Sequence, residues 1–126
     1  MAVSTGVRGE AKMTVAAADT ARALGSGSVD VLGTPRVVAL CEEACCRAVA
    51  GDLPATATTV GMKVRIDHLQ PSPIGGSVIA EAQLQKVEGR RLTFTVSASD
   101  DRGLVAVGKV VRVVVDIERF MSKCGA

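Results

Sequence analysis

One stretch of the sequence limits the possible folds more than any other. Residues 33–51 have the composition and the boundary residues of a helix of about four turns. Thr34 is a good N-cap residue, Pro35 suits the first helical position, and Gly51 suits the C-terminal end. The residues between them are mostly Ala, Leu, Val and Cys, so the helix is apolar around most of its circumference. We therefore expect a long helix that the rest of the chain encloses.

After residue 54 the hydrophobic period changes from 3.6 to 2, which is typical of half-buried strands. One face of the first strand carries Val60, Met62, Val64, Ile66 and His68, and the other carries Gly61, Lys63, Arg65 and Asp67. Residues 77–85 and 91–99 alternate in the same way, with turns at 88–90 and 100–103. Residues 104–117 are almost continuously valine, which indicates a strand covered on both faces or lying at an interface.

The region before the helix is less regular. We expect an edge strand within residues 10–17, a short helix over 19–24 and a flexible Gly-Ser loop over 25–28. The full order predicts an α+β fold, in which a curved antiparallel sheet wraps around one long central helix. A single domain is expected at residues 10–122, with a flexible leader at 1–9 and a tail at 123–126.

Composition argues against several classes of function. The 126-residue chain has a net charge of +2, two Phe and no Trp or Tyr, which is unlike a nucleic-acid-binding protein. It has neither an apolar run long enough to cross a membrane nor the apolar segment of a signal peptide, so we expect a cytoplasmic location. Three of the four cysteines lie in the long helix without a second pair to complete a zinc site. We expect reduced core thiols and no metal, with a redox or metal-binding role of these cysteines as the alternative.

Three residues could carry chemistry. His68 is the single histidine and ends a strand on the inward face, where it is either a functional group or a satisfied core residue. Glu42 lies on the apolar helix and needs a partner, whereas Glu43 can pair with Arg47 one turn later. Thr34 stands at the helix start, where backbone N–H groups can stabilise negative charge on a carbonyl oxygen. Thr34 and Glu42 are about 12 Å apart along the axis, so a substrate or water lies between them, or the groups come from two subunits.

Basic residues supply further candidates. Arg112 interrupts the valine run and needs an anionic partner, which is either a protein carboxylate or a ligand. One hairpin contains Lys86, Arg90 and Arg91 close together. They form either a solvent-exposed turn or a contact for phosphate groups.

An ordered set of residues resembles a known family. The set comprises Thr34, Leu40-Cys41-Glu42, Ala44-Cys45, Arg47-Ala48, Gly61, Asp67-His68, residues 87–92 and Arg112. Over roughly residues 12–120 the chain resembles hotdog-fold thioesterases, in particular the group typified by fluoroacetyl-CoA thioesterase. The resemblance implies that Thr34, Glu42 and His68 are catalytic and that Gly61 and Arg112 belong to the substrate pocket.

The same resemblance implies the reaction and the assembly. An acyl-CoA thioester would be hydrolysed to a free acid and CoA, without a cofactor beyond the CoA of the substrate. The subunits would form a homodimer or a dimer of dimers, joined edge to edge with sites at the interface, and Arg90 and Arg91 are candidate contacts for the CoA phosphates. The aromatic lid of the fluoroacetyl-specific enzyme has no counterpart in residues 25–28, so the acyl group is left unspecified.

Other functions remain open at this point. A hydratase or dehydratase of the same fold also uses a histidine and an acidic residue, but it has no need of Thr34, and Asp67 is expected on the other face. An acyl-CoA-binding or regulatory module would bind CoA esters without releasing thiol. In a purely structural dimer, His68 and Glu42 would be hydrogen-bonded core residues.

Overall fold

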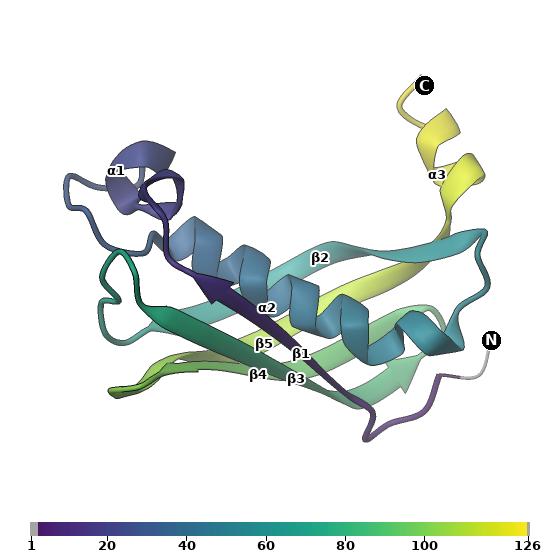
Figure 1. Ribbon diagram of the computed structural model, residues 1–126. Coiled ribbons are helices and arrows are strands. Elements are labelled where there is room, and N and C mark those ends of the chain that lie inside the picture. Colours follow the sequence, from purple (N-terminus) through teal and green to yellow (C-terminus); the bar gives the residue numbers. More distant parts are fainter. Residues whose placement is uncertain (1–2, 126) are drawn as a thin grey trace.

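The computed structural model describes residues 3–125 of the chain. In chain order the elements are β1 (Arg8–Thr14), a 3-10 turn (Ala17–Asp19), α1 (Ala21–Leu24), α2 (Thr34–Val49), a 3-10 turn (Ala50–Asp52), β2 (Ala57–His68), β3 (Ser77–Glu88), β4 (Arg91–Asp100), β5 (Gly103–Asp116) and α3 (Ile117–Ser122). Helix α2 lies across one face of the sheet, with α1 near one end and α3 projecting at the other (Figure 1). Residues 1, 2 and 126 of the expected leader and tail lie outside the described residues.

Helix α2 matches the predicted helix except at its ends. Its N-cap residue is Gly33, whereas Thr34 is the first helical residue. Gly51 does not end the helix in a left-handed conformation, because the chain continues into the 3-10 turn and Gly51 has no positive φ. The buried face consists of Val37, Leu40, Cys41, Ala44, Cys45, Ala48 and Val49. Ala39 and Arg47 are exposed, so the sheet encloses the helix on one side only.

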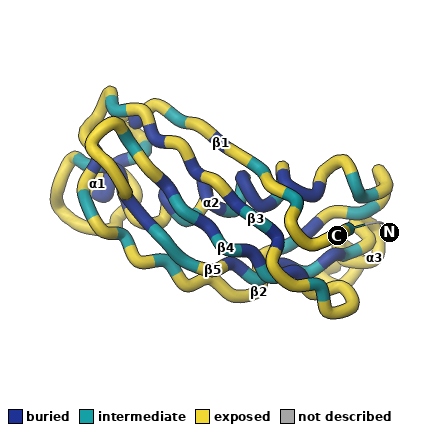
Figure 2. The backbone as a smooth tube through the Cα atoms, turned by 90° about the horizontal axis from the view of Figure 1, so that it is seen from below, coloured by how far each residue is buried: buried dark blue, intermediate teal, exposed yellow. Residues whose placement is uncertain are grey.

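The five strands form one antiparallel sheet in the order β1-β3-β4-β5-β2. This arrangement confirms the predicted α+β layout and the edge position of the first strand. The predicted alternation is also confirmed: Val78, Ala80, Ala82 and Leu84 of β3 are buried, as are Leu92, Phe94, Val96 and Ala98 of β4. Figure 2 shows buried stretches alternating with more exposed ones along the strands of the sheet. Burying each large apolar side chain contributes about 1.5–3 kcal/mol to folding.

A β-bulge in β2 corrects the predicted faces of that strand. Before the bulge, Thr59 is buried and Gly61 lies against Glu42 of α2, so the odd-numbered residues face the helix. The register shifts directly after Gly61, and the extra residue Met62 reverses the alternation. The predicted inward positions of Val60 and Met62 are therefore wrong, whereas the inward position of His68 is right.

Strand β1 packs directly on α2 at Gly9. A Cβ atom at this position would overlap the carbonyl oxygen of Ala44 and the backbone of Ala48. The close approach requires a glycine on the strand and is helped by small residues on the helix. Strand β1 begins at Arg8, two residues before the expected start of the domain.

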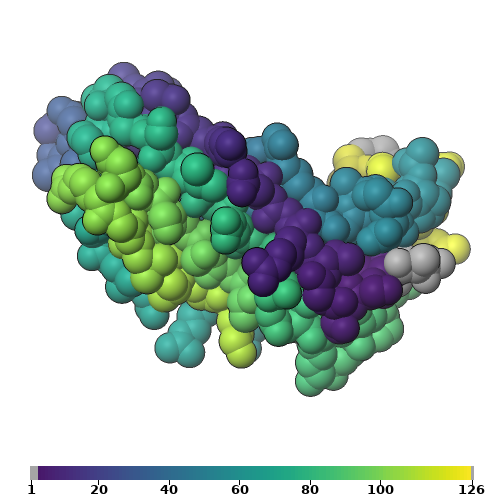
Figure 3. All heavy atoms as spheres, turned by 60° about the horizontal axis from the view of Figure 1, so that its bottom comes forward, coloured from purple at the N-terminus to yellow at the C-terminus, as the bar shows by residue number. Residues whose placement is uncertain are grey.

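Strand β5 lies between β4 and β2, and its two faces differ. Val110 and Val114 are buried on the face toward α2. Val111 and Val113 alternate with them and are half-buried on the outer side of the sheet, which Figure 3 views. Within one chain the valine run is therefore covered on one face. Among residues 3–125, no helix combines the length and the apolar composition needed to cross a membrane.

Candidate active site

Thr34 and His68 meet at the start of α2. The distance between Thr34 Oγ1 and His68 Nδ1 is 2.8 Å, a short hydrogen bond between residues 34 positions apart. Helix α2 supplies the threonine at its first residue, and β2 supplies the histidine at its last. Gly33 occupies the N-cap position and Thr34 is the first helical residue, so Thr34 is not the N-cap that the sequence suggested, and its hydroxyl binds the imidazole instead. The structure thus brings together two of the three predicted catalytic residues.

The surroundings of His68 favour a neutral imidazole. Burial lowers the pKa of His68 from its ordinary value, and the nearby backbone of Gln70 opposes this only in part. When the hydroxyl of Thr34 donates to Nδ1, the ring proton lies on Nε2. Nε2 is buried and has no hydrogen-bond partner among residues 3–125. A buried donor without an acceptor is unfavourable, so this atom is ready to bind a group from outside the chain.

Glu42 and Arg112 form an ion pair farther along α2. The distance from Arg112 Nη1 to Glu42 Oε2 is 2.5 Å, and the Arg112 side chain is only 8% exposed. Arg112 also donates from Nε to Thr59 Oγ1 at 2.9 Å and from Nη2 to the Thr59 carbonyl at 2.8 Å. Arg112 therefore binds a protein carboxylate, one of the two alternatives for this cation. Glu43 pairs with Arg47 at 3.0 Å, as predicted.

Gly61 lies against this ion pair. A Cβ atom at Gly61 would overlap Glu42 Oε2 and approach Arg112 Nη1 to 3.5 Å. The missing side chain therefore leaves the space that the carboxylate occupies. Sequence alternation alone placed Gly61 on the outer face, whereas the resemblance placed it in the substrate pocket; the bulge in β2 puts it on the inner face, beside Glu42.

The chain thus holds two separate pairs on one helix, Thr34–His68 and Glu42–Arg112. A cavity of about 300 Å³ adjoins the first pair, and neither member of the second pair lines it. The other lining residues are Ala21, Ser26, Val29, Val31, Leu32, Leu69, Gln70 and Pro71. Sequence reasoning did not identify this lining, because it comes from α1, the loop before α2 and the segment after β2.

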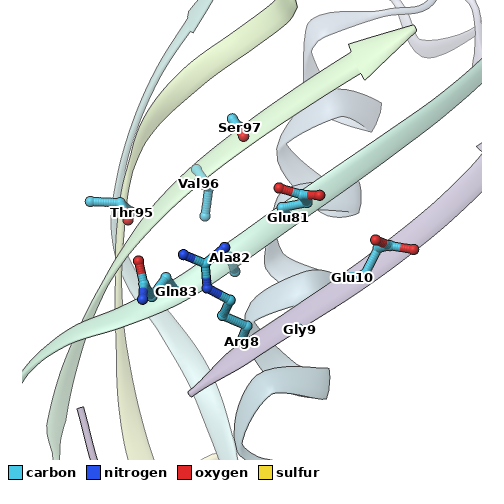
Figure 4. A pocket seen from close by; sticks show the side chains of 9 residues that line it. All are labelled: Arg8, Gly9, Glu10, Glu81, Ala82, Gln83, Thr95, Val96 and Ser97. Carbon is cyan, nitrogen blue, oxygen red and sulfur yellow. The ribbon is translucent and has the colours of Figure 1, made fainter. Parts of the chain in front are cut away.

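Further hollows lie away from the Thr34–His68 pair, and two of them bear on the predicted residues or on the outer face of the sheet. Arg90 and Arg91 line one of about 430 Å³ together with Met62 and Glu88, next to the bulge of β2. Another, of about 370 Å³, lies on the outer side of β1, β3 and β4 (Figure 4). Its walls include Arg8, Glu10, Glu81 and Gln83. None of its nine lining residues, all of them within the described chain, belongs to the predicted site.

The cysteines of α2 are mostly inert core residues. Burial raises the pKa of the Cys41 thiol to about 11 and that of the Cys45 thiol to about 12. Thiols with such values are almost entirely protonated at neutral pH and react slowly. Cys46 is half-buried, with its sulfur 3.9 Å from Thr59 Oγ1. Within the described residues, no three His, Cys, Asp or Glu side chains gather as they would around a metal ion.

Comparison with known proteins places this chain in a family. The sequence profile of the fluoroacetyl-CoA-specific thioesterase family matches residues 15–118. The fluoroacetyl-CoA thioesterase of Streptantibioticus cattleyicolor is 36% identical over 94 residues, which cover 75% of this chain and 68% of that protein.

Solved structures agree with the sequence match. The fluoroacetyl-CoA thioesterase FlK superposes with a TM-score of 0.92 at 31% identity, covering 98% of this chain and 96% of that one. A variant of FlK in complex with acetyl-CoA gives a TM-score of 0.91 at 31% identity, covering 97% and 96%. A thioesterase superfamily member from Thermus thermophilus, 24% identical with a TM-score of 0.87 over 98% and 94%, shares the fold. The predicted hotdog fold is confirmed, and the chain belongs to the fluoroacetyl-CoA-specific thioesterase family of thioester hydrolases.

Proposed function

We propose that this chain hydrolyses acyl-CoA thioesters and that Thr34, His68 and Glu42 carry the reaction. The observation that supports the proposal most directly is the 2.8 Å contact between Thr34 Oγ1 and His68 Nδ1 beside a cavity. A hydroxyl hydrogen-bonded to a neutral imidazole is the arrangement that activates an oxygen nucleophile. The proposed reaction converts R-CO-S-CoA and water into R-COOH and CoA-SH.

The proposed step begins at Nδ1 of His68. This nitrogen takes the proton from the Thr34 hydroxyl, or from a water molecule held by it, while the oxygen attacks the thioester carbonyl. The C–S bond then breaks, and the imidazolium returns its proton to the departing CoA sulfur, which leaves as the thiol. Attack by water yields the free acid directly, whereas attack by Thr34 leaves an acyl ester that a water molecule, deprotonated by His68, hydrolyses to the acid and the free hydroxyl. Pro35 has no N–H, and the N–H groups of Arg36 and Val37 donate to the Gly33 carbonyl. The N–H of Thr34 itself donates to none of the described residues, so it is the backbone donor available to the developing oxyanion.

A second copy of the chain would complete the site. His68 presents Nε2–H without an acceptor, and Glu42 has a carboxylate oxygen, Oε1, that accepts no hydrogen bond within residues 3–125. One chain cannot join them, because Thr34, which binds His68, is eight residues from Glu42 on the same helix, about 12 Å along its axis. In a dimer joined along the β2 edges, the Glu42 carboxylate of one protomer would accept from His68 of the other.

Other residues take supporting roles in the proposal. Arg112 and Gly61 position the Glu42 carboxylate, one by donating to it and the other by leaving space for it. Arg90 and Arg91 would contact the CoA phosphates at the hollow beside β2. The four cysteines are all free thiols, which fits a reducing compartment such as the cytoplasm.

The test measures release of free CoA thiol from acetyl-, fluoroacetyl-, hexanoyl- and phenylacetyl-CoA. Both His68→Ala and Thr34→Ala are expected to lower kcat by about 10²–10⁴-fold, the usual contribution of general base catalysis. Thr58→Ala, the same change at an exposed position of β2, is the matched control and should keep the wild-type rate. Thermal unfolding of each variant shows whether the fold is retained.

Two results would contradict the proposal. Retention of full activity by folded His68→Ala would remove the histidine from the reaction. Binding of acyl-CoA without thiol release by the wild type would instead favour a binding module.

A further inference from the structure

The walls of the cavity beside Thr34 and His68 are mostly apolar. Of the ten lining residues, all within the described chain, six are aliphatic side chains or proline. His68 is the one titratable group among them, and the remaining polar groups are the neutral side chains of Ser26, Thr34 and Gln70. A wall without fixed charge suits an uncharged apolar group and offers no cationic partner to an acyl group that carries a second carboxylate.

Two of these wall residues are unusually exposed for their type. Val29 is 56% exposed and Leu69 is 55% exposed. Val29 lies in the loop that leads into α2, and Leu69 directly follows His68. Both are therefore attached to the elements that carry the Thr34–His68 pair. In a single chain, apolar surface at this place is in contact with water unless a ligand or the proposed second copy covers it.

The size of the cavity also bears on its ligand. A volume of about 300 Å³ corresponds to the space of about ten water molecules and lies at the lower end of ligand pockets. A two-carbon acyl group would leave most of it unfilled. The loop at residues 25–28 is Gly-Ser-Gly-Ser and has no bulky side chain that could close the space.

From the charge, exposure and volume of this cavity we infer that it receives a straight aliphatic acyl chain of about four to eight carbons. The inference rests on the proposed function, since it assigns the acyl group to the same site. Val29 and Leu69 are then specificity-determining residues, because they contact the chain beyond its first two carbons.

Chain length is the variable that tests this assignment. Two quantities are measured for chains of two, four, six and eight carbons: kcat/KM for the acyl-CoA, and the dissociation constant of the matching S-alkyl-CoA thioether, which cannot be hydrolysed. Each methylene moved from water to an apolar wall improves binding by up to about fourfold. We expect both quantities to improve at least tenfold between two and six carbons.

A pair of leucine variants tests the wall itself. Leu69→Ala should weaken the six-carbon thioether about tenfold and the two-carbon thioether less than threefold. Leu104→Ala is the matched control, because Leu104 is 45% exposed but does not line the cavity, and it should change neither value.

The outcomes separate the inference from the proposed function. Thioether affinity that rises with chain length without thiol release would support the acyl cavity and refute hydrolysis. Hydrolysis that is fastest for two-carbon esters, with thioether affinity independent of length, would overturn the inference and leave hydrolysis standing.

Discussion

Gly61→Ala tests whether the space beside Glu42 holds the ion pair together. Gly61 has no positive φ, so alanine is compatible with its backbone. The new Cβ would overlap Glu42 Oε2, which must retreat by about 1 Å to restore ordinary van der Waals contact. Oε2 now lies 2.5 Å from Arg112 Nη1, and such a movement would take the hydrogen bond to the limit of useful length.

The expected loss of stability is moderate. Removing one partner of a buried ion pair costs about 3–5 kcal/mol. Glu42 is 30% exposed and can rotate, and Arg112 keeps both hydrogen bonds to Thr59, so we expect about 1–2 kcal/mol for Gly61→Ala. For a chain of this size, that loss lowers Tm by about 4–8 °C. The proposed hydrolysis should also slow, because the carboxylate is displaced.

Calorimetry or far-UV circular dichroism is the suitable assay, since the chain has no Trp or Tyr for intrinsic fluorescence. Gly51→Ala is the matched control: its Cβ would meet no atom within 4 Å, and stability should be unchanged or higher by up to about 1 kcal/mol. In a Glu42→Ala background, Gly61→Ala should have little effect, because the overlapping oxygen is absent. An equal loss in both backgrounds would refute this reasoning.

Three further predictions follow from burial. Because the pKa of His68 is lowered in the folded state, its contribution to stability is present above about pH 6.5 and is lost as pH falls from there toward the folded-state pKa. In His68→Gln, the free energy of unfolding should therefore change less with pH across that window. An unchanged pH dependence of the unfolding free energy would contradict the shift. Native protein treated with a thiol reagent should be modified first at exposed Cys124, while Cys41 and Cys45 react only on unfolding, as peptide mapping would show; early labelling of either buried thiol would count against the packing. Gly9→Ala should destabilise by more than about 3 kcal/mol in a denaturant titration, since backbone atoms on α2 block the Cβ and cannot rotate away; a stable variant would show that β1 can shift.

Local patterns predicted much of the fold. The alternation along residues 77–84 and 91–98 identified the inner faces of β3 and β4, because both segments follow a period of two. The ion pair of Glu43 and Arg47 followed from helical spacing. In each case the information lies within a few residues of the chain.

The rest depended on contacts between distant residues. The bulge at Met62 has no signature in the alternation, so the pattern did not indicate that Thr59 lies on the inner face and binds Arg112. The partner of Glu42 is 70 residues away on another strand. The N-cap was assigned to Thr34, a residue type that favours this position, but Gly33 occupies it and the Thr34 hydroxyl binds His68. The resemblance grouped these residues, whereas propensity alone could not.

The contact of Gly9 with α2 has a consequence for the evolution of the site. Because strand backbone touches helix backbone, α2 cannot slide along its axis or turn about it without separating from β1. Thr34 and Glu42 lie on this one helix, so the contact with an edge strand that contains neither residue fixes the position of both. Natural variation that changes the acyl group is therefore more readily accommodated in the segments around the helix, such as the Val29 loop, than in the helix itself.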